Sequence, residues 1–292
     1  MNMKKKIFVL GSLNNDLVIN AQRMPERGET VCGNGFFTSY GGKGANQAVA
    51  CAKLSGKVCM CGCVGDDEQG KNYLKYLKSV GVNADCVKIV GNAPTGVAVV
   101  VVIDGDNRII IDKGANDVLG KADVDAFLSK ADEGDIFLAQ LENPVDVIGY
   151  ALKQASSKGM KVVLNPAPAD KQIEKYLKYC NIIVTNESET ALLGGEDRLL
   201  GYADCLIVTL GGRGYKIVNK TSEKIYPCIK VDVVDTTAAG DTFCGGLCAM
   251  ISNGNSIEDA AAYGSKAASI ACTKKGAQPS IPTEEQVNSH II

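Results

Sequence analysis

The sequence predicts a doubly wound α/β fold, in which a mostly parallel central sheet carries helices on both faces and a small β-sheet forms a lid. Short apolar runs recur along the chain, with helical segments between most of them. The runs are continuously apolar rather than alternating, which is typical of strands buried on both faces of a parallel sheet. They span residues 7–10, 58–64, 136–141, 162–164, 182–184 and 206–210.

The segments between these runs have helical periodicity. Residues 67–80 place Leu74, Leu77 and Val80 on one face, and Gly81 follows as a stop signal. A helix of small residues is expected at 48–54, after a glycine-rich turn at 41–47. Strands and helices therefore alternate over most of the chain, which supports the doubly wound fold.

Two segments interrupt this alternation, because they are β-rich and contain no helical pattern. Residues 94–112 include two strand-like stretches around a turn at 104–107, and residues 14–40 are similar in character. Each could be only an edge hairpin, but two insertions of one character favour a joint lid that excludes water during chemistry. We expect a core of residues 1–13, 41–93 and 113–292, and a lid of residues 14–40 and 94–112.

Composition excludes several classes of protein. The chain has 292 residues, 46% of them hydrophobic, so it can bury one large core with an accessory element. The net charge is −2 and the basic residues are scattered, which argues against a nucleic-acid partner. No apolar stretch reaches the roughly 18 residues of a membrane span. With no cleavable leader pattern either, we expect a cytoplasmic protein that does not bind membranes.

Twelve cysteines and a single histidine limit the available chemistry. The cysteines form no C-x-x-C pair and His290 lies near the C-terminus, so the spacing of a zinc site is lacking. Cys59, Cys61 and Cys63 alternate in a predicted strand, where free cysteine packs as a small hydrophobe. A single histidine also argues against Ser-His-Asp and Cys-His mechanisms, which leaves carboxylates as the acid/base groups.

Polar side chains follow the predicted strands one after another. The carboxyl ends of parallel strands share one edge of the sheet, and ligands bind at that edge in open α/β folds. Any one of these residues could be an ordinary loop residue, but chance placement is a poor explanation for the whole set. The set comprises Asn14, Asp16, Glu142, Asn143, Asn165, Asn186, Glu189 and the turn at 211–214.

Residues 235–243, a turn containing glycine that leads into an apolar helix, carry the most informative pattern. The first N–H groups of a helix bind anions such as phosphate, and those of Ala239, Gly240 and Asp241 are expected to be free and to converge. An anion repels a neighbouring carboxylate, which makes sense if Asp241 takes a proton from an incoming hydroxyl. The simpler alternative is that Asp241 only stabilises the helix through its dipole.

Three further segments offer binding groups. The turn at 41–47 presents Lys43 and Asn46 to hydroxyls, but it is neither a Walker loop nor a dinucleotide fingerprint. A nucleotide is therefore expected at 209–214, although these glycines could equally form only a tight turn. Asn186 and Glu189 could organise Mg²⁺, directly or through water, or they could simply cap a helix.

Taken together, these motifs resemble the ribokinase family of carbohydrate kinases over nearly the whole chain. The matching segments, in the family's order, are 11–16, 41–50, 165–169, 186–189, 235–243 and 275–280. The resemblance implies transfer of the γ-phosphate of ATP to the 5-hydroxyl of D-ribose, giving D-ribose 5-phosphate. The alternatives are the same reaction on deoxyribose, fructose or a nucleoside, and a sugar-binding protein that has lost catalysis.

The resemblance also implies a role for each matching residue. Asp241 is the implied base, and the implied anion hole is made by the N–H groups of Ala238, Ala239, Gly240 and Asp241. The implied sugar ligands are Asn14, Asp16, Gly42, Lys43, Asn46, Glu142 and Asp241. The implied nucleotide ligands are Asn186, Thr209, Gly211, Gly214 and Gly240. Mg²⁺ is implied to bind indirectly through Glu189, and K⁺ near Asp235, Thr237, Gly276 and Ser280.

Two departures from the family pattern and one partner complete the expectations. Ala238 stands where the family commonly has glycine, a change that is tolerated because main-chain N–H groups do the binding. Residues 263–266 lack a histidine that some members place near the adenine, which leaves the contacts to the base open. The resemblance further implies a homodimer formed through the lid.

Overall fold

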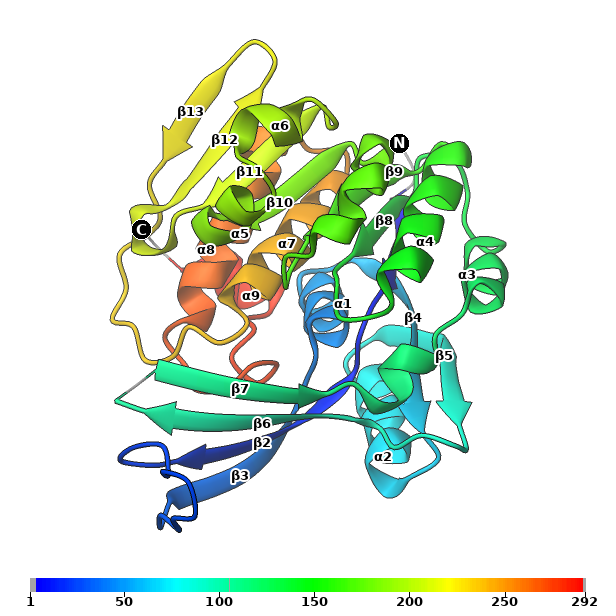
Figure 1. Ribbon diagram of the computed structural model, residues 1–292. Helices are drawn as coiled ribbons and strands as arrows, with labels where there is room; N and C mark the ends of the chain where they lie inside the picture. Colours follow the sequence, from blue (N-terminus) through cyan, green and yellow to red (C-terminus); the bar gives the residue numbers. More distant parts are fainter. Residues whose placement is uncertain (1–3, 105, 291–292) are drawn as a thin grey trace.

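A computed structural model describes residues 4–104 and 106–290. The main sheet runs in the order β13-β12-β11-β10-β9-β8-β1-β4-β5 (Figure 1). Neighbouring strands are parallel except at the β11–β12 and β12–β13 pairs, so the predicted mostly parallel sheet is confirmed. The strands are β1 (Lys6–Leu10), β4 (Lys57–Gly65), β5 (Val82–Val90), β8 (Ile136–Ala139), β9 (Lys161–Leu164), β10 (Ile182–Asn186), β11 (Cys205–Thr209), β12 (Tyr215–Asn219) and β13 (Glu223–Tyr226).

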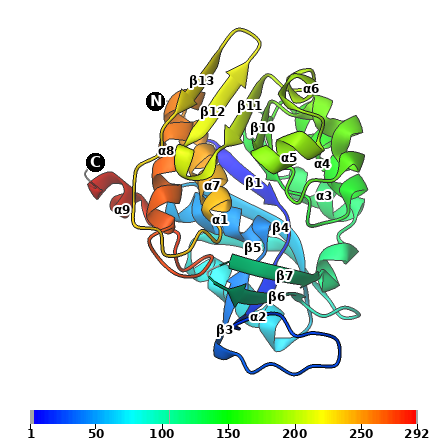
Figure 2. The ribbon, with the colours of Figure 1, turned by 60° about the vertical axis from the view of Figure 1, so that its left-hand side comes forward.

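Helices cover both faces of this sheet (Figure 2). Successive side chains of β1 enter different cores: Ile7 and Val9 pack on one side, and Phe8 and Leu10 on the other. The first side holds α1 (Lys43–Lys53), α2 (Glu68–Ser79), α7 (Ala239–Ser252), α8 (Ile257–Ala271) and α9 (Glu284–Ser289). The second holds α3 (Lys121–Leu128), α4 (Val145–Ser157), α5 (Glu187–Leu192), α6 (Glu196–Leu200) and the 3₁₀ helix η2 (Lys171–Tyr179).

Several expected elements have different bounds in the structure, and α1 and β8 differ most clearly. The helix expected at 48–54 is α1 and already begins at Lys43, so the glycine-rich segment forms its first turn. Small residues allow this, because a side chain at Gly44 would lie 2.4 Å from the main chain of Gly11 and Ser12. The strand expected at 136–141 ends at Ala139. The helix expected at 67–80 is α2, with Asp67 as its N-cap.

A second sheet of four strands lies across the edge at which the main parallel strands end (Figures 1 and 2). Its order is β3-β2-β6-β7, in which β2 and β6 are parallel and the other pairs antiparallel. The chain enters it from β1 through residues 11–13 and leaves it directly into α1. Its role as a lid stays a prediction. The strands are β2 (Asn14–Asn20), β3 (Asn34–Gly41), β6 (Gly96–Ile103) and β7 (Asp106–Asp112).

All twelve cysteines are free, as the sequence predicts. Only Cys32, in the loop between β2 and β3, is exposed. Cys61 and Cys63 pack in the core beneath α3 and α4, as small apolar residues do. Within 4–104 and 106–290, no helix is both long and apolar enough to cross a membrane.

Candidate active site

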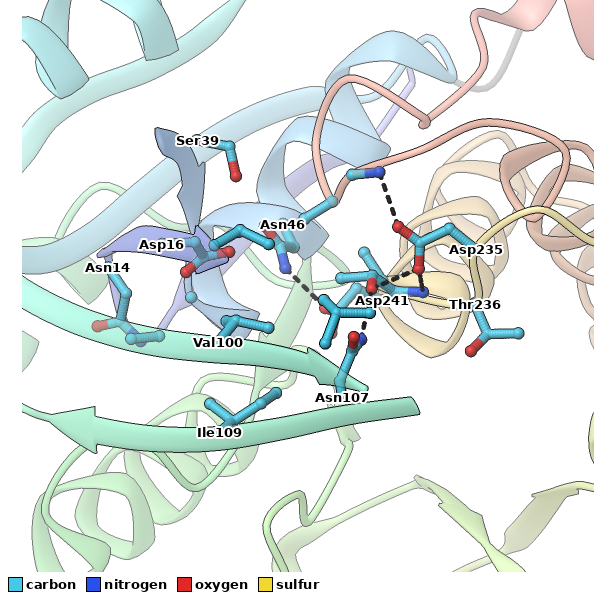
Figure 3. Close-up of a pocket in the computed structure, with 18 of the residues that line it drawn as sticks. Asn14, Asp16, Ser39, Asn46, Val100, Asn107, Ile109, Asp235, Thr236 and Asp241 are labelled. Carbon is cyan, nitrogen blue, oxygen red and sulfur yellow. Dashed lines mark hydrogen bonds between the residues drawn. The ribbon is translucent and has the colours of Figure 1, made fainter. Parts of the chain in front are cut away.

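Two cavities lie side by side where the parallel strands end. The larger, about 650 Å³, lies between the main sheet and the inner face of the small sheet, and Figure 3 shows its wall. The smaller, about 230 Å³, lies at the ends of β10 and β11. Lys43, Thr236, Ala238 and Asp241 line both cavities, so a group bound in one would lie next to a group bound in the other.

Asp241 lies in the first turn of α7 and is only 6% exposed. Its Oδ2 accepts a hydrogen bond from Nδ2 of Asn46 at 2.9 Å (Figure 3). Its Oδ1 accepts one from Nε2 of Gln47 at 3.0 Å. Both donors come from α1, which packs against α7. The carboxylate is therefore held in one orientation at the wall shared by the two cavities.

The turn before α7 brings the main chain to the smaller cavity. Ala238 adopts a φ of 60°, in the left-handed region that glycine prefers and that costs other residues about 1 kcal/mol or more. A side chain at Gly240 would meet nothing within 4 Å, so the main chain is open to a ligand there. The N–H of Ala239 is not free, contrary to expectation, because it donates to the carbonyl of Thr236 at 3.1 Å.

All seven residues expected to hold the sugar line the larger cavity. Glu142 is fixed there because its Oε2 accepts hydrogen bonds from Oγ of Ser12 at 2.5 Å and from the N–H of Lys43 at 3.0 Å. Gly42 adopts a φ of 85°, and a side chain on it would lie 2.8 Å from the nitrogen of Asn14. Only glycine therefore lets the main chain pass this close to β2.

Charges in the larger cavity shift two pKa values. Burial, together with the carboxylates of Glu142 and Asp241, raises the pKa of Asp16 to about 7. Burial alone would lower the pKa of Lys43, but the carboxylates of Asp241, Glu142 and Glu189 outweigh it and raise that pKa. Lys43 is therefore a fixed positive charge between the two cavities.

Asn186, Glu189 and Thr209 line the smaller cavity. Asn186 caps α5 by accepting from the N–H of Glu189 at 2.8 Å, and Glu189 accepts from the N–H of Asn186 at 2.9 Å. The cap and a binding role are therefore compatible, since the same residues border the cavity. Burial raises the pKa of Glu189 and nearby Asp241 adds to this, although the Asn186 N–H and Lys43 oppose it.

Gly211 and Gly214 lie outside both cavities, in and after the 3₁₀ turn η3 (Gly211–Arg213). The N–H of Gly214 donates to the carbonyl of Gly211 at 3.0 Å, so they do form a tight turn. A side chain at Gly214 would lie 2.0 Å from the carbonyl oxygen of Tyr226, and its φ of 101° also favours glycine, so packing and the turn account for this residue. A side chain at Gly211 would meet nothing within 4 Å, and Gly211 comes two residues after Thr209 in the sequence.

Asp235, Thr237 and Gly276 form a hydrogen-bonded unit beside the larger cavity (Figure 3). Oδ1 of Asp235 accepts from the N–H and hydroxyl of Thr237 at 2.9 and 2.6 Å, and Oδ2 accepts from the N–H of Gly276 at 2.8 Å. Burial alone would raise the pKa of Asp235, but these hydrogen bonds hold it below its usual value. Ser280 is buried and its hydroxyl donates to the carbonyl of Ala277 instead.

Several buried polar residues support the site although sequence reasoning assigned them no role. Within the described ranges, no group of three or more His, Cys, Asp or Glu side chains is arranged to hold a metal ion. Amide side chains dominate instead, and a buried amide has no periodicity or spacing that would mark it in the sequence. They are Gln47, Gln140 and Gln278, with Tyr73 beside them; Asn165, which the sequence predicts at the ligand edge, accepts from Gln47.

The small sheet also reaches across the larger cavity. Nδ2 of Asn107, at the start of β7, donates to Oγ1 of Thr237 at 3.0 Å (Figure 3). This hydrogen bond joins the tip of the small sheet to the turn before α7. The cavity is therefore covered on the side of β6 and β7.

A family model supports the interpretation of this site. The model of the pfkB family carbohydrate kinase matches residues 4–284. The chain belongs to the pfkB family of carbohydrate kinases. This membership confirms the family that the sequence motifs predict, and it shows that the protein is an enzyme.

Other family members agree with the match in sequence and in fold. A protein named ribokinase from Schizosaccharomyces pombe is 41% identical, over 97% of this chain and 96% of its own length. One named deoxyribokinase from Salmonella typhimurium is 35% identical, over 98% of each chain. The structure of Arabidopsis thaliana ribokinase complexed with ribose and ATP has a TM-score of 0.86 and 31% identity, over 98% of both chains.

Proposed function

We propose that this carbohydrate kinase transfers the γ-phosphate of ATP to the 5-hydroxyl of D-ribose, giving D-ribose 5-phosphate and ADP. The observation that carries the proposal is that Asp241 lines both cavities at the first turn of α7. A sugar hydroxyl in the larger cavity and a phosphate in the smaller one would meet at this carboxylate. The names of the relatives support ribose as the acceptor. With ATP as co-substrate, we place the reaction in the cytoplasm.

The larger cavity suits a neutral sugar with several hydroxyl groups. Carboxylates accept hydroxyl hydrogens, and Asp16 and Glu142 present them from β2 and from the segment after β8. Asn14, Asn46 and Lys43 add donors, and the main chain at Gly42 can approach a hydroxyl closely. Because the wall contains acceptors and donors, each hydroxyl of a bound sugar can be paired, which favours a particular pattern of hydroxyls.

Phosphoryl transfer needs positioning and charge neutralisation more than covalent chemistry. We assign Asp241 as the base that takes the proton of the attacking hydroxyl. The main-chain N–H groups from Ala238 to Asp241 face the transferred phosphoryl group, with Ala239 giving up its turn hydrogen bond if it takes part. Lys43, which lines both cavities, adds a positive charge where they meet. Such fixed dipoles and charges stabilise the transition state because they are already oriented.

The nucleotide occupies the smaller cavity in this proposal, with Asn186 and Thr209 beside the phosphates and the turn at 211–214 beyond them. Mg²⁺ commonly binds through one or two carboxylates, waters and substrate phosphates. Apart from the base Asp241, Glu189 is the one carboxylate among the described residues lining this cavity, so it fits an ion held by water and ATP rather than by a protein cage. The ion would neutralise charge on the transferred phosphate.

We also propose that K⁺ binds beside the turn before α7. Asp235 is held as a carboxylate there, and residues 276–280 add carbonyl oxygens, so the donor set consists of hard oxygen atoms. The hydrogen bonds that Thr237 and Gly276 donate to Asp235 occupy part of its capacity. We therefore assign the ion's contacts to carbonyls of the loop, with Asp235 and Ser280 shaping it.

The outer face of the small sheet supports a homodimer. Side chains of β7 alternate, so Ile109 and Ile111 line the cavity while Ile110 faces outward and is 67% exposed. Val99, paired with Ile110 across the strands, and Phe36 are also exposed apolar residues of this sheet. An exposed apolar patch on a soluble enzyme marks an interface. We propose that two copies meet through this face and thereby complete each other's lid.

A panel assay tests the proposed function. Release of ADP is measured with ribose, deoxyribose, fructose and a nucleoside, each with Mg²⁺ and with either K⁺ or a quaternary ammonium salt. We expect the highest kcat/KM for ribose, and a higher rate in K⁺ than in the ammonium salt. A higher kcat/KM for another acceptor would reassign the substrate. Sugar binding in calorimetry without ADP release would point to a protein that has lost catalysis.

A further inference from the structure

We propose that Gln278 is a positioning residue that fixes which end of the Asn46 amide faces the base Asp241. The inference rests on the proposed role of Asp241. Gln278 is completely buried between α1 and the C-terminal loop and lies outside both cavities. It cannot touch sugar or ATP, so it can act on the reaction only through its neighbours.

A chain of hydrogen bonds leads from the base to the end of a strand of the small sheet. Nδ2 of Asn46 donates to Asp241, and Oδ1 of Asn46 accepts from Nε2 of Gln278 at 3.0 Å. The same Nε2 donates to the hydroxyl of Tyr73 at 2.6 Å, and that hydroxyl donates to the carbonyl of Gly41 at 2.5 Å. Gly41 is the last residue of β3, next to the sugar-binding turn.

The carbonyl of Gly41 sets the direction of every hydrogen bond in this chain. A carbonyl can only accept, so Tyr73 must donate to it and must therefore accept from Gln278. Gln278 then presents its NH₂ group, and Asn46 must turn its oxygen toward Gln278 and its own NH₂ toward Asp241. If Gln278 were reversed, Asn46 would turn its oxygen toward the carboxylate, and the two would repel each other.

The other oxygen of Asp241 is held in the same way. Nε2 of Gln47 donates to Asp241 and also to Oδ1 of Asn165 at 3.0 Å, and Nδ2 of Asn165 donates to the carbonyl of Val184 at 2.9 Å. This second chain also ends on a main-chain carbonyl. Both oxygens of the base are thus held by amides whose orientation is determined further away, and Gln278 is a member that lines neither cavity.

Two substitutions of Gln278 test the proposal. Gln278→Met keeps an unbranched side chain but leaves the Asn46 amide free to turn over, so we expect kcat to fall about tenfold. Gln278→Glu supplies acceptors where donors are needed and favours the reversed Asn46, so we expect a fall of about 100-fold. KM for ATP should stay within about twofold in both, because the smaller cavity is not touched. A role in packing alone would instead leave kcat unchanged in any variant that folds.

Tyr73→Phe tests the chain without altering Gln278, which covers the case in which Gln278→Glu does not fold. Loss of the hydroxyl removes the group that orients Gln278, and we expect kcat to fall roughly three- to tenfold. Tyr76→Phe is the matched control, since Tyr40 stacks on Tyr73 at 4.4 Å and on Tyr76 at 4.7 Å, and only Tyr73 belongs to the chain.

The outcomes separate this inference from the proposed function. An inactive wild-type protein in the ribose assay would overturn the function. A wild type that is active, with kcat within twofold of it in both Gln278→Met and Tyr73→Phe, would overturn the positioning role. Equal losses in Tyr73→Phe and Tyr76→Phe would also overturn it, because they would trace the effect to the aromatic stack.

Discussion

Replacing Asp241 with asparagine is the most direct test of the proposed chemistry. The substitution keeps the size of the side chain but removes its negative charge and its ability to take a proton. In the structure the two oxygens of Asp241 accept from Asn46 and Gln47, at 2.9 and 3.0 Å. The NH₂ group of the new asparagine must therefore face one of these donors.

The structure allows the sizes of two effects to be worked out separately. Loss of a general base costs about 10²- to 10⁴-fold in kcat, which corresponds to about 3–5 kcal/mol of barrier. The buried N–H that loses its acceptor costs about 1–3 kcal/mol of stability. For a chain of this size each kcal/mol lowers Tm by roughly 2–4 °C. Asp241→Asn should therefore fold at room temperature and still be almost inactive.

The assay measures kcat for ribose phosphorylation, ribose binding by calorimetry and Tm by thermal melting. We expect the loss in kcat to exceed any loss in ribose affinity. Asp259→Asn is the matched control, because Asp259 is an exposed aspartate in the first turn of α8. If Asp241→Asn kept kcat within tenfold of the wild type, Asp241 would not be the base. Its place in the first turn would then reflect only the helix dipole.

Three further predictions concern charge and assembly. The folded-state pKa of Asp16 is raised to about 7 from 3.8, so its protonated carboxyl contributes fully to stability below pH 3.8. That contribution is lost as the pH rises through 7. Thermal melts of the sugar-free protein should therefore show that Asp16→Asn raises Tm above pH 7 but not near pH 3.8. Lys43→Met removes a buried cation that three carboxylates surround, and steady-state assays should show kcat/KM falling at least about 100-fold. A fall below tenfold would contradict its place between the substrates. Ile110→Asp puts a charge on the outer face of the small sheet, and analytical ultracentrifugation should show monomers where the wild type forms dimers; a wild type that is monomeric throughout would refute the interface.

Much of the fold was predictable because burial on both faces leaves a simple pattern. The six predicted strands of the parallel region are short continuous apolar runs, and α2 shows both its periodicity and its N-cap in the sequence. The edge strand β5 was missed, because its apolar residues alternate with polar ones. The start of α1 was not predictable in this way. Its first turn is Lys43, Gly44 and Ala45, and glycine reads as a turn signal although here it lets the helix pack on the main chain of Gly11.

The candidate site, too, was only partly predictable from the sequence. Residues that end strands were found because parallel strands gather their carboxyl ends at one edge, and the sugar-site residues all reach the larger cavity. The supporting amides were missed because their partners are far apart in sequence: Gln278 binds Asn46 across 232 positions. No local pattern records such a pairing. The nucleotide-binding role of Gly211 and Gly214 stays a prediction, although packing and a tight turn already account for Gly214.

The position of Cys32 offers a practical way to measure the motion of the loop between β2 and β3. It is the single exposed thiol, and it lies in the loop at the far end of β2 and β3. A maleimide fluorophore should therefore label the native polypeptide there first, with no engineered cysteine and no deletion of the other eleven. Stopped-flow emission on adding ribose would then report, in real time, how fast this loop responds to sugar.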